Sequence, residues 1–129
     1  MKHLFVFSLA CISLSGGCAC IKAEQAAYRK VSAIEAYKMM SELGDYIILD
    51  VRTDEEYKEK RIAGAILIPN YEIKNRAEKE LPDKSKVILV YCRSGGRSAN
   101  AARELAGLGY ENVYDFGGII DWPYDTVSD

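Results

Sequence analysis

One cysteine in this chain stands where its neighbours predict chemical reactivity. It follows a continuous apolar run, residues 87–91, and precedes a glycine-rich stretch with two arginines: Cys92, Arg93, Ser94, Gly95, Gly96, Arg97 and Ser98. Loop-enclosed and electropositive surroundings of this kind are typical of reactive thiols. The alternative is an inert core thiol, since free cysteine also behaves as a small hydrophobic residue. The pattern favours a nucleophile.

The stretch after the cysteine predicts an anion site built from backbone. Gly95 and Gly96 reach backbone conformations that a Cβ would forbid, so successive N–H groups can point toward the sulfur. A helix beginning at Arg97 or Ser98 would add its positive end. An ordinary thiol is only a few per cent ionised at neutral pH, but such surroundings stabilise the anion. We therefore expect Cys92 to be a thiolate without a general base.

Histidine is missing from the part of the chain that we expect to fold. The single histidine, His3, lies in the N-terminal stretch. A cysteine protease needs a histidine beside its nucleophile. The sequence therefore argues against that class and favours chemistry that needs a thiolate alone.

Apolar runs alternate with helical segments, which predicts an α/β domain with a central parallel sheet of about five strands and helices on both faces. Ser32 and Glu35 have the spacing of a capping box, so a helix should begin there. Residues 17–30 are interpreted as a polar linker. Strands are expected at 46–49, 65–68, 87–91 and 113–116, and helices over 53–60, over 72–81 and from about residue 98, with a helical turn within 117–122.

Asp50 ends the first apolar run as Cys92 ends the third. The carboxyl ends of parallel strands meet at one edge of a sheet, and ligands bind there. Both side chains should therefore lie at the same rim. We expect Asp50 to brace the cysteine loop through an arginine, and an ordinary turn aspartate is the alternative.

Three ordered stretches resemble one family. Residues 92–98 resemble the active-site loop of the rhodanese sulfurtransferases, residues 50–69 the family's upstream signature, and residues 117–122 its closing one. The resemblance implies a rhodanese-like three-layer fold and a thiosulfate sulfurtransferase-like enzyme. Cys92 would carry a sulfane sulfur as a persulfide, from thiosulfate or a persulfide donor to a thiol or cyanide. It implies no cofactor and no metal.

The same resemblance implies roles for the loop. The amides of residues 93–98 would stabilise the anionic persulfide in the manner of an oxyanion hole. Arg93 and Arg97 would orient an anionic donor, because guanidinium groups suit anions with several oxygens. Ordinary surface charge is the alternative for both arginines. The expected partners are thus a small anionic sulfur donor and a thiol acceptor.

Two other functions stay open. A cysteine phosphatase or arsenate reductase needs the spacing C-x5-R, whereas Cys92 to Arg97 is C-x4-R and Ser98 stands where the arginine should be. The shorter loop favours sulfur over a phosphoryl group. A non-catalytic rhodanese-like module that binds a partner or senses redox state is the second alternative, since fold does not fix function.

The N-terminus has the order of a secretory signal: a charged start, an apolar stretch and then small residues. We expect residues 1–23 to be a signal segment, residues 24–129 a single rhodanese domain, and the protein to be exported to the periplasm or cell envelope. Cys18 lies in a stretch that resembles a lipobox, so a lipoprotein signal with a lipid anchor at Cys18 is the alternative to a secretory one. Whether Cys20 stays in the mature protein is left open.

The overall charge disfavours one class of partner. The chain of 129 residues carries 17 basic and 19 acidic side chains, a formal charge of -2. Nucleic-acid binding requires clustered lysine and arginine, so we expect no such partner. We expect a monomer.

Overall fold

The computed structural model describes residues 27–129. The predictions for the signal segment, His3, Cys18 and Cys20 lie outside these described residues. From residue 27 onward, no helix is long and apolar enough to cross a membrane. The elements follow in the order β1 (Arg29–Lys30), α2 (Ala33–Glu42), β2 (Ile47–Asp50), α3 (Asp54–Glu59), β3 (Ile66–Leu67), η1 (Asn70–Glu72), α4 (Ile73–Glu80), β4 (Val87–Cys92), α5 (Gly96–Gly107), β5 (Asn112–Gly118) and η2 (Ile119–Asp121).

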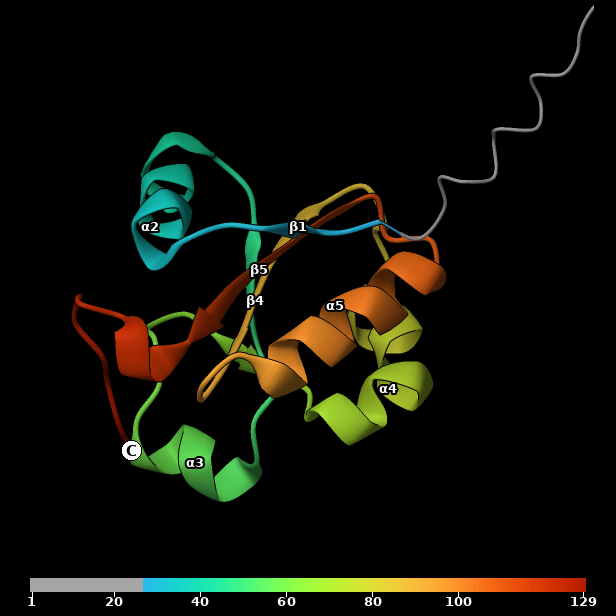
Figure 1. Ribbon diagram of the computed structural model, residues 1–129. Helices are drawn as coiled ribbons and strands as arrows, with labels where there is room; N and C mark the ends of the chain where they lie inside the picture. The colour runs from blue at the N-terminus through green and yellow to red at the C-terminus, as the bar shows by residue number, and fades with distance from the viewer. Residues whose placement is uncertain (1–26) are drawn as a thin grey trace, which may run out of the picture.

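The strands form one parallel sheet in the order β1-β5-β4-β2-β3 (Figure 1). The cysteine-bearing strand β4 is central, between β2 and β5. Its last residue, Cys92, pairs with Gly118 of β5 after an irregularity in the register. The prediction of an α/β domain with a parallel sheet of about five strands is confirmed.

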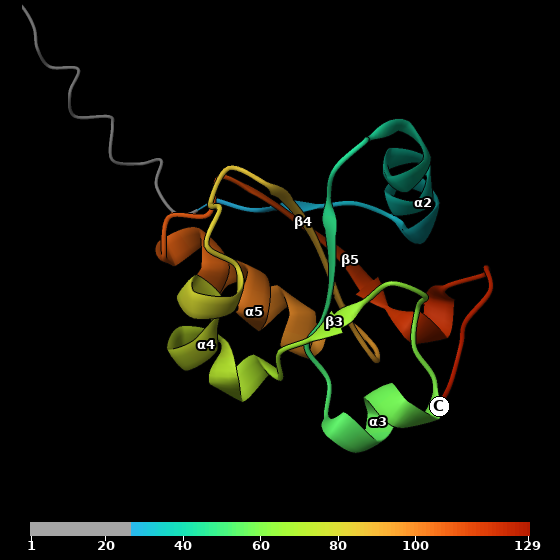
Figure 2. The ribbon, with the colours of Figure 1, turned by 180° about the vertical axis from the view of Figure 1, so that it is seen from behind.

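Helices cover both faces of the sheet, as predicted (Figures 1 and 2). On one face, α4 and α5 bury Ile73, Ala77, Ala101 and Leu105 against apolar side chains of β2 and β4. On the other, α2 packs its buried Ala36 against a second cluster that includes Phe116. Removing this apolar surface from water is the main favourable contribution to folding. The sheet is thereby held rigidly between two layers.

Helix α2 begins as the sequence predicts, with both hydrogen bonds of the Ser32–Glu35 capping box formed. The apolar residues of α2 do not all face the core. Ala36 is the buried one, whereas Ile34 and Tyr37 are largely exposed. Spacing along the helix therefore identified the element and not its inward face.

Two sequence predictions need correction, one on the extent of the linker and one on the burial of a strand. Arg29 and Lys30, interpreted as linker, form β1, a short exposed strand that pairs with the edge of β5. Two charged residues give no apolar pattern, so only their pairing reveals the strand. β3, expected to be covered on both faces, is an edge strand with a partly exposed Ile66.

The short helix α3 packs differently from the others. None of its residues is buried, and it lies beyond the carboxyl ends of the strands, at the same end as the loop between β4 and α5 (Figure 1). Since this is the edge where ligands bind in parallel sheets, α3 forms part of the rim around Cys92.

Candidate active site

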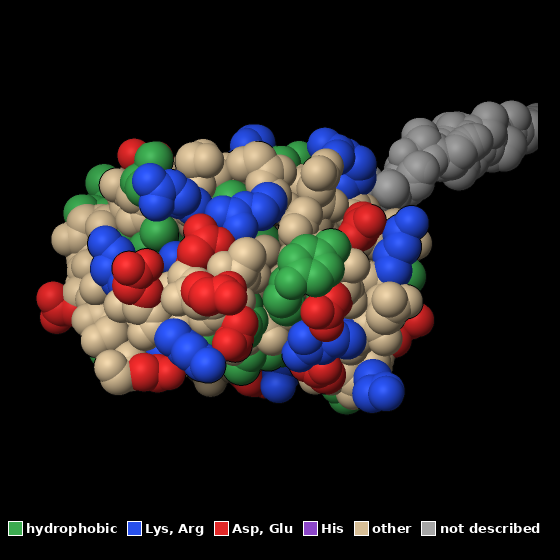
Figure 3. Space-filling model, turned by 90° about the horizontal axis from the view of Figure 1, so that it is seen from below, with side chains coloured by type: hydrophobic (Ala, Val, Ile, Leu, Met, Phe, Trp, Pro, Cys, Tyr) green, Lys and Arg blue, Asp and Glu red, His purple; other side chains and the backbone are tan. Residues whose placement is uncertain are grey.

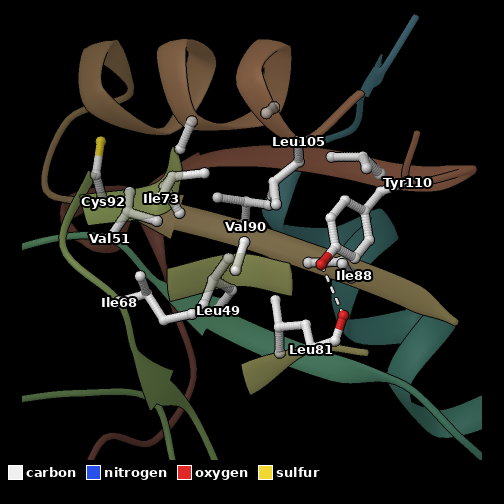
Figure 4. Close-up of a cluster of buried hydrophobic side chains, with 14 residues drawn as sticks. Leu49, Val51, Ile68, Ile73, Leu81, Ile88, Val90, Cys92, Leu105 and Tyr110 are labelled. Atoms are coloured by element: carbon white, nitrogen blue, oxygen red, sulfur yellow. Dashed lines mark hydrogen bonds between the residues drawn. The ribbon is translucent and has the colours of Figure 1, made fainter. Parts of the chain in front are cut away.

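The thiol of Cys92 lies at the junction of β4 and α5. It is 1% exposed and belongs to the core cluster under α5, and Figure 4 shows its sulfur directed toward the first turn of that helix. The backbone N–H of Gly95 donates to its Sγ over 3.0 Å. Helix α5 begins immediately afterwards at Gly96, two residues earlier than Ser98. A helix N-terminus and an inward amide therefore both face the sulfur, which suits an anion.

Gly95 makes this geometry through its own backbone. Its φ is +117°, the left-handed region that favours glycine. It is also the residue just before α5, so the chain reverses at Gly95 and enters the helix in one step. Residues 93–95 thus connect β4 to α5, and residues 96–98 already belong to the first turn of the helix.

Gly118 forms the wall against which this loop lies. A Cβ at this position would stand 2.1 Å from the carbonyl oxygen of Arg93 and 2.5 Å from Cα of Ser94. The N–H of Ile120 also donates to that carbonyl oxygen over 3.2 Å. The sequence predicted a helical turn within residues 117–122. The strict need for glycine at 118 was missed, and the pair of glycines, Gly117 and Gly118, was its only signal.

Arg97 contacts a carboxylate that sequence reasoning missed. Its guanidinium donates to both oxygens of Glu56 in α3, over 2.8 and 3.0 Å. The hydrogen bond from Arg97 lowers the pKa of Glu56 to about 2, and the pKa of Arg97 is raised in return by Glu56. Glu56 also completes a capping box with Thr53. Arg97 therefore joins α5 to α3, and its role in donor binding stays a prediction.

This ion pair predicts a pH-dependent stability. Because the folded-state pKa of Glu56 lies below its ordinary 4.5, the stabilisation is complete above that value and is lost as the pH falls toward about 2. Glu56→Gln should lower the free energy of unfolding by about 1 kcal/mol at neutral pH, and the deficit should vanish in strong acid. Urea unfolding at both pH values measures it. A deficit that persists in acid would contradict the pairing, and Glu59→Gln, an exposed neighbour, is the matched control.

Asp50 is buried, and its arginine partner is Arg52. It binds Arg52, with the shortest contact at 2.7 Å, and accepts a hydrogen bond from the hydroxyl of Tyr91, also over 2.7 Å. Burial, followed by the charge of Asp50, raises the pKa of Tyr91. No hydrogen bond joins Asp50 to residues 93–98. Its support reaches Cys92 through the neighbouring Tyr91, and direct bracing of the loop stays a prediction.

A cavity of about 340 Å³ opens at the rim beside the loop. Arg93 and Lys60 both line it, and neither side chain forms an ion pair within residues 27–129. Figure 3 views the molecule from this end and shows basic and acidic side chains interspersed. The residues that line this cavity are Arg52, Glu56, Glu59, Lys60, Arg93, Ile119 and Ile120.

The chain is similar in sequence to known proteins. A family model described as a rhodanese-like domain matches residues 32–123. The chain is 40% identical over 73 residues to the thiosulfate sulfurtransferase PspE of Escherichia coli (strain K12), covering 57% of this chain and 70% of that protein. It is 34% identical over 96 residues to the thiosulfate sulfurtransferase GlpE of Coxiella burnetii (strain RSA 331 / Henzerling II), covering 74% and 87%.

Solved structures agree with the sequence matches. A rhodanese with anions from E. coli superposes with a TM-score of 0.61 and 36% identity, covering 65% of this chain and 99% of that one. A rhodanese-related protein from Thermoplasma volcanium gives a TM-score of 0.69 and 32% identity, covering 79% and 100%. The likeness is therefore one of overall fold.

Proposed function

Since this chain belongs to the rhodanese family, and is a sulfurtransferase by that membership, we propose that Cys92 carries a sulfane sulfur from thiosulfate or a persulfide donor to a thiol or cyanide. One observation carries the proposal: the sulfur of Cys92 accepts the N–H of Gly95 at the start of α5. A thiol placed against amides and a helix N-terminus is suited to hold negative charge in each intermediate.

The proposed transfer has two balanced steps. The Cys92 thiolate attacks the outer sulfur of thiosulfate, the S–S bond of the donor breaks, and sulfite leaves with the bonding electron pair. The enzyme then holds the persulfide anion. An acceptor thiolate or cyanide attacks the terminal sulfur, the new S–S bond breaks, and the Cys92 thiolate returns. Neither step consumes an external oxidant or reductant.

The loop contributes stabilisation and no proton transfer. Its amides are fixed before the reaction, so their dipoles need no reorganisation as charge moves onto the terminal sulfur. The short C-x4-R spacing suits one added sulfur better than a phosphoryl group. Arg97 is paired with Glu56, so we assign the first attraction of the donor to Arg93, whose exposed side chain lines the rim cavity.

Arg93→Ala should raise the KM for thiosulfate about tenfold and change kcat less, because it removes an attraction that precedes the chemical step. Steady-state thiocyanate formation at varied thiosulfate measures both constants. Arg103→Ala is the matched control, since the side chain of this exposed arginine of α5 hydrogen-bonds Asn100 and lies outside the cavity lining. An unchanged KM in Arg93→Ala would exclude this role.

The function is tested by loading the protein with thiosulfate. Intact mass should rise by one sulfur atom, and cyanide should then release thiocyanate and restore the original mass. If the protein gains no sulfur, and hydrolyses phosphate esters instead, it is a phosphatase of related fold and the proposal fails. If it does neither, it is a binding module.

We also propose that the protein works in the periplasm or cell envelope. The support is the signal-like order of residues 1–23 and the lipobox-like stretch before Cys18. Fractionation of expressing cells, with mass analysis of the mature N-terminus, distinguishes a cleaved, a lipidated and a retained protein. Recovery of the intact chain in the cytoplasm would contradict export.

A further inference from the structure

Asp115 is a buried carboxylate in the middle of β5, 1% exposed, that contacts two segments of the active site. Its Oδ1 accepts the hydroxyl of Ser98 over 2.7 Å and the N–H of Gly117 over 2.9 Å. Its Oδ2 accepts no hydrogen bond. The nearby cation is the side chain of Lys30, which is 67% exposed and whose Nζ lies 3.5 Å from that oxygen. Oδ1 thus accepts two hydrogen bonds and Oδ2 accepts none.

Such a group is expensive to bury. A buried polar atom without a hydrogen bond destabilises the fold, and a mostly exposed lysine compensates a carboxylate weakly. If packing alone mattered, an apolar residue at position 115 would avoid the cost of burying a carboxylate oxygen without a hydrogen bond. The two bonds to Oδ1 are charge-assisted, and these are stronger than neutral ones. The position therefore favours a residue that holds Ser98 and Gly117.

Both partners adjoin the residue that faces the sulfur. The hydroxyl of Ser98 also lies 3.1 Å from the carbonyl oxygen of Gly95, but a hydroxyl has one hydrogen, which the shorter contact to Asp115 takes. A Cβ added to Gly95 would stand 3.9 Å from Cα of Gly117. Gly95 is thus enclosed between a helix turn and a strand end, and Asp115 binds both.

We propose that Asp115 is a positioning residue for sulfur transfer. By fixing Ser98 and Gly117, it keeps the N–H of Gly95 aimed at the sulfur of Cys92 through the reaction. It touches neither substrate nor sulfur. The proposal rests on the proposed function for its catalytic part, while the ordering of the loop is a property of the protein alone.

The test compares Asp115→Ala, which removes the acceptor, with Asp115→Asn, which keeps an oxygen for both donors. In the full chain, Asp115→Ala should lower kcat about tenfold or more with a smaller change in KM, because misplacing a catalytic amide acts on the chemical step. Amide hydrogen exchange in residues 93–98 should become faster. Asp115→Asn should recover most of both losses. Glu111→Ala, an exposed acid just before β5, should change neither.

Ser98→Ala extends the test if Asp115→Ala does not fold. It should speed loop exchange and lower kcat. Where Asp115→Ala does fold, adding Ser98→Ala to it should cost less than the sum of the single changes, because the two share the hydrogen bond between Ser98 and Asp115. Equal losses in Asp115→Asn and Asp115→Ala would overturn the acceptor role. So would an unchanged kcat in a variant with a loosened loop, or unchanged exchange in both single variants. If neither the wild type nor any variant transfers sulfur, the proposed function fails. If amide exchange in residues 93–98 is still faster in Asp115→Ala than in Asp115→Asn and the wild type, the positioning of the loop by Asp115 stands.

Discussion

Cys92→Ser should abolish sulfur loading and lower thiocyanate formation at least about 10³-fold, because a serine hydroxyl is un-ionised at neutral pH and cannot replace a thiolate nucleophile. The site itself should survive. Serine is slightly smaller than cysteine and its oxygen can accept the same N–H of Gly95. The variant should therefore stay folded, with the effect confined to chemistry. Intact mass after thiosulfate treatment and a thiocyanate assay measure the loss.

The matched control removes every other thiol. Cys11, Cys18 and Cys20 are the remaining cysteines of the chain, and their combined replacement by serine should leave loading by thiosulfate intact. If Cys92→Ser still gains sulfur and forms thiocyanate, another group carries the sulfur and the proposed mechanism is wrong. If the triple variant loses loading instead, the sulfur carrier lies in the N-terminal segment.

Gly118→Ala should have the second largest effect. The new Cβ would stand 2.1 Å from the carbonyl oxygen of Arg93 and 2.5 Å from Cα of Ser94, distances that force backbone to move. Overpacking against backbone costs about 3 kcal/mol, and here the loop that holds Cys92 must yield. We expect a lower midpoint of urea unfolding and a fall in kcat of about 10²-fold, since small displacements of catalytic groups are costly.

The control for this change is another glycine in an open place. Gly107, the last residue of α5, has nothing within 4 Å of its added Cβ and no positive φ. Gly107→Ala should keep full activity and gain about 0.5 kcal/mol of stability through helix propensity. A Gly118→Ala protein with wild-type kcat would show that the contact between the strand end and the loop has no catalytic consequence.

The fold was largely predictable because each element carries a local signal. Apolar runs marked β2, β4 and most of β5, and the capping box at Ser32 marked the start of α2. β1 was missed because Arg29 and Lys30 are charged and exposed, and only pairing with β5 makes them a strand. The exposure of Ile34 could not be predicted either, because burial depends on what packs against the helix and not on the spacing of its apolar residues.

The site divides in the same way. Residues 92–98 are consecutive, so their turn, their glycines and the following helix could be read from the chain. Glu56, Asp115 and Gly118 were not assigned because each reaches the loop from another element, across sequence separations that carry no local pattern. Asp50 binds Arg52 and Tyr91, partners that the sequence did not specify, and its support of the loop stays a prediction.

The amino-acid sequence by itself determined the candidate nucleophile, the strand that carries it, the glycine turn and the lack of histidine in residues 27–129, because these depend on residue types and short spacings. Only the tertiary structure decided which groups hold that turn. Arg97 is bound by Glu56 of the preceding helix α3, and Ser98 by the buried Asp115 of the later strand β5. The loop backbone packs closely against Gly118, where a Cβ would not fit. Such contacts are set by how the sheet and helices pack, because packing brings together residues that are distant in the chain.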